Sequence, residues 1–182
     1  MRLHRRRIVL AVLGAASSSL LMGHMPYRQW QVFRAVHLFV VTSSTDPQAG
    51  ELADRIAETL AARLPKSKAL AAEARDAHEV MQLLRSHQIQ VALVTTDEAD
   101  AAQRGAGDIA EGGAIALRVL TQLGSRLLVV LPDFPDDKAY DIARALADFP
   151  AAQRTADPAA PAVPLHPGAI AFREGRPPPP AR

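Results

Sequence analysis

The order of apolar and polar positions along the chain predicts alternating strands and helices. Continuous apolar runs at 36–42 (VHLFVVT) and 89–96 (IQVALVTT) are typical of strands buried on both faces. A weaker strand is expected at 69–74, within ALAAEA. Two segments between these runs repeat their apolar residues at helical spacing, and a proline at 65 ends the first. Their apolar stripes are formed by Leu52, Ile56, Leu60 and Leu64, and by Val80, Leu83 and Leu84.

The second half of the pattern adds two strands and one helix. Strands are expected at 115–123 and 126–132, and a helix at 133–148. The polar, glycine-rich residues 97–113 predict a loop or a short helix. Proline and alanine dominate beyond Pro150, so we expect regular structure to end there. Strands alternating with helices over short connections favour a three-layer α/β fold with a mostly parallel sheet.

The N-terminus has the pattern of a targeting segment. Four arginines within residues 2–7 precede an uncharged stretch at 8–23 (IVLAVLGAASSSLLMG). Residues 1–30 are therefore interpreted as a membrane anchor or a signal peptide, and the arginines favour a periplasmic location for the remainder. The expected organisation continues with one α/β lobe at 33–149 and a proline-rich tail at 150–182.

The charge balance argues against nucleic acid as a partner. The chain carries 21 Lys and Arg against 19 Asp and Glu. Removing the four N-terminal arginines leaves 21 − 4 = 17 basic residues against 19 acidic ones, so the folded part is slightly acidic. No basic stripe with interleaved aromatics is present in the sequence.

Polar segments follow each of the first three predicted strands, and those after the first and third strands are rich in hydroxyls. Ligands of open α/β sheets bind beyond the carboxyl ends of the strands, and helix N-termini there can hold anions. Serine, threonine and aspartate are also ordinary helix caps, so a purely structural role stays open. The candidate ligand-binding residues are Thr42, Ser43, Ser44, Thr45, Arg75, Thr95, Thr96 and Asp97.

No constellation of catalytic residues is found in the sequence. The chain has no cysteine, and its six histidines show no metal-ligand spacing. The GxSxG and GxxxxGK[ST] motifs are both missing. We therefore expect a protein that is not an enzyme and that uses no cofactor or metal.

Several segments resemble the TAXI family, the solute-binding subunits of a class of TRAP transporters. PLHPGAIAFREG at 164–175 is similar to the family's C-terminal signature, and DFPDDKAYDIARAL at 133–146 to its late helix. Residues 40–61 and 89–105 resemble its first and third strand–loop units. The resemblance implies a periplasmic-binding-protein-like fold that binds a carboxylate or amino-acid-like solute. It also implies TRAP membrane subunits as partners at the bacterial inner membrane.

The chain departs from this family in ways that bear on function. A whole second lobe is missing between residues 132 and 133, and the glycines of the family's first loop are replaced by Asp46, Pro47 and Gln48. The three loops hold four acidic residues against Arg75 alone, so we expect dicarboxylate binding to be weak or lost. The alternative is a membrane-anchored interaction or sensor module, in which two copies could form a homodimer. We expect the tail to dock on the sheet through Leu165, Ile170 and Phe172, with His166 as a packed cap.

Overall fold

The computed structural model describes residues 36–150 and 162–180, which belong to one compact unit. The predicted anchor or signal segment at 1–30 lies outside the described residues. Within the described ranges, no helix combines the length and the apolar character needed to cross a membrane.

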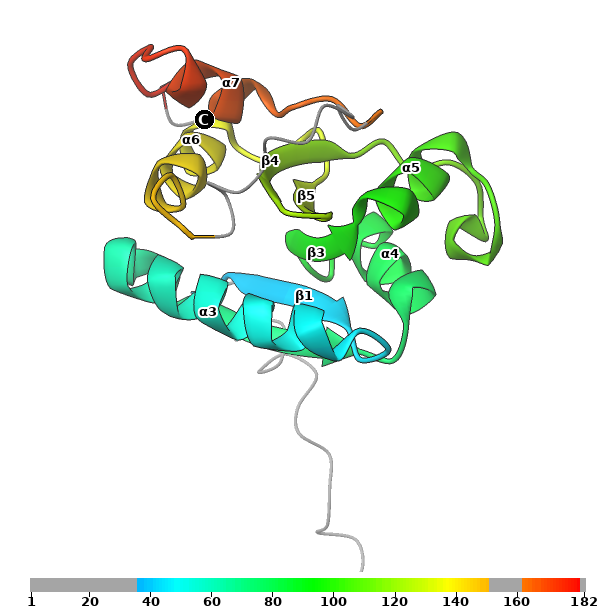
Figure 1. The fold of residues 1–182 in the computed structure, drawn as a ribbon. Coiled ribbons are helices and arrows are strands. Elements are labelled where there is room, and N and C mark those ends of the chain that lie inside the picture. Colours follow the sequence, from blue (N-terminus) through cyan, green and yellow to red (C-terminus); the bar gives the residue numbers. More distant parts are fainter. Residues whose placement is uncertain (1–35, 151–161, 181–182) are drawn as a thin grey trace, which may run out of the picture. The chain divides into compact units, whose positions relative to one another are not determined.

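A five-stranded sheet with the order β2-β1-β3-β5-β4 forms the centre of the domain (Figure 1). Strand β1 lies between β2 and β3 and is parallel to both, whereas β5 is antiparallel to both β3 and β4. Four of the five strands therefore run in one direction, and the predicted α/β class with a mostly parallel sheet is confirmed. The strands are β1 Phe39–Ser43, β2 Leu70–Ala74, β3 Val91–Thr95, β4 Arg118–Leu123 and β5 Arg126–Val130.

Helices cover both faces of this sheet and complete the expected three layers (Figure 1). On one face, α3 (Pro47–Arg63) and α6 (Asp136–Ala145) pack on β1, β3, β4 and β5. On the other face, α4 (Ala77–Arg85) and α5 (Thr96–Arg104) bury their apolar stripes. Two short 3-10 turns, η1 (Pro65–Ser67) and η2 (Asp108–Ala110), join these elements.

The antiparallel strand arises from a tight turn. Only Gly124 and Ser125 separate β4 from β5, and Gly124 has a φ of +68°, which glycine adopts without strain. A two-residue connection permits only a hairpin, so β5 starts at the edge where β4 ends and runs back in the opposite direction. This turn therefore adds a fourth segment to the edge where β1, β2 and β3 end.

The expectation that regular structure ends at Pro150 was wrong. Residue Leu165 forms a parallel bridge with Val119 of β4, and α7 (Pro167–Arg173) follows. His166 caps this helix and Pro167 occupies its first turn, a favourable combination for helix initiation. The run HPGAIAF therefore starts a helix, although the composition around it is that of a linker.

The helix α7 packs chiefly against α6 and also touches β4 of the sheet (Figure 1). A Cβ at Gly168 would overlap the backbone carbonyl of Asp136 and come within 2.9 Å of the Ala139 Cβ, so this contact requires glycine. Phe172 stands edge-on to Tyr140 with ring centroids 5.6 Å apart. The predicted docking on the sheet is thus correct for Leu165, whereas Phe172 packs on a helix.

Candidate functional site

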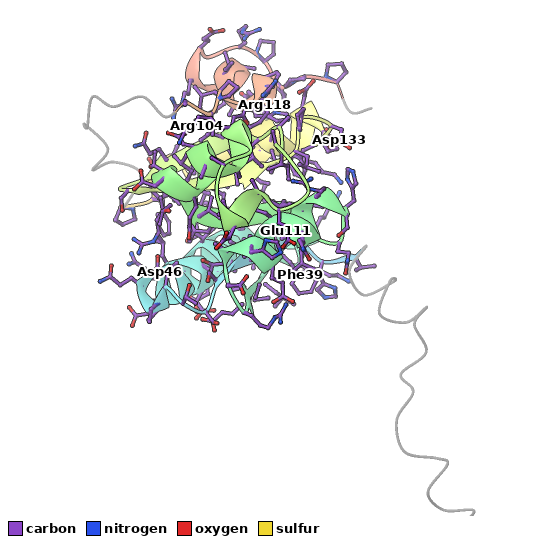
Figure 2. The ribbon with its side chains drawn as sticks, turned by 90° about the vertical axis from the view of Figure 1, so that its right-hand side faces the viewer. Phe39, Asp46, Arg104, Glu111, Arg118 and Asp133 are labelled. Atoms are coloured by element: carbon purple, nitrogen blue, oxygen red, sulfur yellow. The ribbon has the colours of Figure 1, made fainter. Side chains whose placement is uncertain are left out.

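The loops predicted to bind solute do meet at one edge of the sheet. The register pairs Ser43 of β1 with Ala74 of β2, so these parallel strands end side by side. The end of β3 lies next to β1 on the other side, and the β4–β5 turn follows because Thr95 pairs with Arg126. We call this region the carboxyl edge: residues 42–46, 75–79, 95–98 and 124–126. In Figure 2, Asp46 marks it, and Phe39 marks the opposite end of β1.

The hydroxyls of the first loop are bonded within the protein. Thr42 is 1% exposed, and its hydroxyl donates to the Leu93 carbonyl at 3.0 Å. The Ser43 hydroxyl accepts the Thr45 backbone N–H at 3.2 Å and shares a 2.6 Å hydrogen bond with the Thr45 hydroxyl. Ser44, at the exposed tip, donates to a carbonyl of the second loop. These groups brace the carboxyl edge, and only the loop tip faces solvent.

The second loop directs its one cation back onto its own helix. The Arg75 side chain is 79% exposed and contacts Glu79 at 3.1 Å, while its backbone N–H donates to the same carboxylate at 2.8 Å. The hydrogen bond to Glu79 raises the pKa of Arg75. The hydrogen bond from the Arg75 backbone N–H lowers the pKa of Glu79. Asp76 caps α4 by accepting from the Glu79 N–H at 2.8 Å. Arg75 is therefore engaged in an ion pair, and a ligand would have to compete with Glu79 for its guanidinium group.

The third loop begins a helix immediately. Thr95 and Glu98 form a capping box, in which Thr95 accepts the Glu98 N–H and Glu98 accepts the Thr95 N–H. The Thr96 backbone and hydroxyl both donate to the Ser125 carbonyl, at 3.0 and 3.1 Å. Asp97 is exposed in the first turn of α5. Of the alternatives for residues 97–113, the short helix is correct, with glycine-rich turns behind it.

The strongest interaction at the carboxyl edge involves a residue that sequence reasoning missed. Arg126 donates to both carboxylate oxygens of Asp46 at 2.6–2.9 Å, with side chains 16% and 27% exposed. Asp46 also caps α3 by accepting from the Ala49 N–H. The residues of the pair are 80 apart in sequence. The Gly124–Ser125 turn was the available signal, because a hairpin there returns Arg126 to this edge.

His166 is buried and caps α7, as expected from the sequence. Its side chain is 0% exposed, its Nδ1 accepts the Gly168 N–H at 3.2 Å, and its Nε2 lies 3.0 Å from the Phe134 carbonyl. An accepting Nδ1 places the proton of the neutral ring on Nε2, which then donates to Phe134. Burial lowers the pKa of His166, against the opposing effect of Asp136 nearby. The ring joins α7 to the loop before α6.

Metal-binding chemistry finds no support in the described part of the chain, where no three His, Asp or Glu side chains gather in a metal-binding arrangement. No known family model matches this sequence, and no curated protein matches it.

Proposed function

We propose that this chain is a one-lobed relative of TAXI-type solute-binding subunits that meets a small polar solute at the carboxyl edge. The observation that carries the proposal is the convergence of three strand-end loops there, each leading directly into a helix N-terminus. Residues 1–30 would hold the lobe at the periplasmic face of the inner membrane, where TRAP membrane subunits could receive the solute.

The charge of the carboxyl edge determines which solutes fit. Five acidic side chains stand against two arginines, a formal charge of 2 − 5 = −3. Both arginines are already paired, Arg126 with Asp46 and Arg75 with Glu79. A carboxylate ligand would compete with these pairs and face uncompensated acidic groups. The geometry therefore favours an uncharged or cationic polar solute over the dicarboxylates of the family. The acidic residues are Asp46, Asp76, Glu79, Asp97 and Glu98.

A thermal-shift titration of the full chain tests this proposal. The panel is succinate, glutamate and 2-oxoglutarate, together with polyols and the diamine putrescine. A ligand that binds only the folded state raises its stability by RT ln(1 + [L]/Kd). We expect saturable shifts from the neutral or cationic compounds and none from the dicarboxylates. Sub-millimolar affinity for a dicarboxylate would contradict the proposed solute class.

A pair of matched variants locates the site. Asp97→Asn removes an exposed acidic charge at the carboxyl edge, and Asp137→Asn removes one from the first turn of α6 at the other end of the sheet. Only Asp97→Asn should weaken binding of a cationic solute. Equal effects of both variants would show a nonspecific charge response and reject the carboxyl edge as the site.

The second candidate function is a protein-interaction module that works as a homodimer. In the described part of the chain, β2 pairs only with β1, so its outer edge is open, and Leu70 on this strand is 41% exposed. An open strand edge with an exposed apolar residue can pair with a second copy. Sedimentation of the full chain decides between the two: a stable dimer that ignores every solute favours this function.

A further inference from the structure

One of the described cavities lies at the end of the sheet away from the carboxyl edge. It has a volume of about 460 Å³ and opens where β1, β2 and β3 begin. This volume falls within the roughly 300–1,000 Å³ of typical small-molecule sites. We call it the amino-edge pocket. Its apolar wall comes from the residue before β1, the end of α3, the loop before α6 and α6 itself: Leu38, Leu64, Phe134 and Ile142.

Cations surround this apolar wall. Arg63, Lys66 and Lys138 line the pocket with Asp141 as the one acidic residue, a formal charge of 3 − 1 = +2. Asp141 is engaged by Arg144 at 2.8 Å, and Arg63 lies 3.4 Å from Asp148. The carboxyl end of α3 adds about half a negative charge, which the cations exceed. The two lysines have no ion-pair partner among residues 36–150 and 162–180.

A buried hydroxyl in the pocket lining has no hydrogen-bond partner. The Oγ of Ser67 is shielded from solvent, and within the described structure it is one of two buried side-chain atoms without a partner. A buried hydroxyl without a partner costs free energy, and a ligand can bond this atom only where the pocket lining moves aside. The amino-edge pocket thus offers an apolar wall and two ammonium groups that have no ion-pair partner among the described residues.

We propose that the amino-edge pocket binds a small organic anion with an apolar body, of the type of a medium-chain carboxylate. The alkyl part would lie against Leu38, Leu64 and Phe134, and the carboxylate would meet Lys66 and Lys138. This site is separate from the carboxyl edge, and its charge is of the opposite sign. The proposal therefore does not depend on the function proposed for that edge.

Calorimetric titration of the full chain with octanoate tests the pocket. Acetate carries the charge without the apolar body, and octylammonium carries the apolar body with the opposite charge. We expect octanoate to bind more tightly than octylammonium by on the order of tenfold, because attraction to the cations becomes repulsion. Acetate should show no saturable binding. Equal affinity for octanoate and octylammonium, or no saturable octanoate binding, would overturn the proposal.

Charge-reversal variants assign the binding to this pocket. Lys66→Glu and Lys138→Glu should each weaken octanoate by roughly threefold to fivefold. Arg104→Glu makes the same charge change on α5, outside the pocket, and should leave octanoate affinity unchanged. An equal loss in all three variants would show a response to net charge alone and reject the site. Asp97→Asn should not alter octanoate affinity, which separates this result from the test of the carboxyl edge.

Ser67→Ala separates a ligand contact from a structural role. Removing an unpartnered buried hydroxyl should leave the melting temperature of the free protein unchanged or raise it. If the hydroxyl serves the ligand, octanoate affinity falls while the fold persists. A lower melting temperature with unchanged octanoate affinity would show that the hydroxyl supports the fold and would remove it from the site.

Discussion

Asp46 serves two partners with one carboxylate. It caps α3 through the Ala49 N–H and binds Arg126 through both oxygens. The first interaction is local and follows from the residue type before a helix. The second joins the β1–α3 loop to a strand 80 residues later. Because both side chains are largely buried, the pair is screened less than an ion pair on the surface.

Asp46→Asn should therefore destabilise the protein while leaving the helix cap in place, since asparagine caps equally well. The loss is expected to be about 1.5–3 kcal/mol, the range for hydrogen bonds to charged groups. Urea denaturation measures it. Asp141→Asn is the matched control, because the Asp141–Arg144 pair is exposed and should contribute less than about 0.5 kcal/mol. Similar losses in both variants would show that Arg126 adds nothing specific.

At the scale of the element, α7 depends on one histidine for its attachment. His166 begins the helix and holds the loop before α6 through its neutral ring. Protonation places a hydrogen on Nδ1, which can then no longer accept the Gly168 N–H. The helix contact itself is intolerant of added atoms at Gly168. The cap of α7, its close contact with α6 and the protonation of His166 are therefore linked at the first turn of this helix.

The free energy of unfolding should fall as the pH drops below the ordinary histidine value of 6.5. Burial lowers the pKa of His166 in the folded state, so the unfolded chain takes up the proton first. The stabilising contribution is complete above pH 6.5 and declines as the pH falls toward the lowered folded-state pKa, by at most about 1.4 kcal/mol per pH unit. Urea titrations at pH 7.5 and 5.5 measure this. His166→Asn, which can still cap α7, should show a smaller pH dependence, and an equal dependence would exclude His166 as its source.

At the scale of the whole molecule, the C-terminal segment belongs to the domain. Val163 is 1% exposed within the core on the α4–α5 face, and Leu165 bridges to β4. The helix α7 covers part of α6 on the other side of the sheet. The segment therefore extends both layers beside the outer strand β4.

A chain that stops after Ala160 should unfold more easily than the full chain. Burying one valine side chain stabilises a protein by about 1.5–3 kcal/mol. Because the shortened chain loses the buried Val163, Ala169 and Ala171, its free energy of unfolding should fall by more than about 1.5 kcal/mol. Chemical denaturation of both chains measures the difference. A chain that stops after Gly175 retains α7 and serves as the control. Equal stability of the two shortened chains would show that α7 contributes nothing to the domain.

Much of the fold was predictable because it is local. The strands at 36–42 and 89–96 and the helix behind SSTDP follow from apolar periodicity and capping residues. The convergence of three loops followed from their position after parallel strands. The hydrogen-bond partners of the loop hydroxyls could not be predicted in this way. The hydroxyls of Thr42 and Ser44 donate to the carbonyls of Leu93 and Arg75, which belong to other segments of the chain. The α7 helix was missed because its surroundings have the composition of a linker.

The sequence by itself determined the α/β class, the location of α3, α4 and α6, and the placement of polar loops at strand ends. These features depend on residue periodicity and on interactions a few positions apart. Only the tertiary structure decided that Arg126 neutralises Asp46, that His166 bonds the Phe134 carbonyl, and that cations surround an apolar pocket wall. Each of these joins residues from separate elements, and the energy of such contacts depends on burial and distance, which only the folded chain defines.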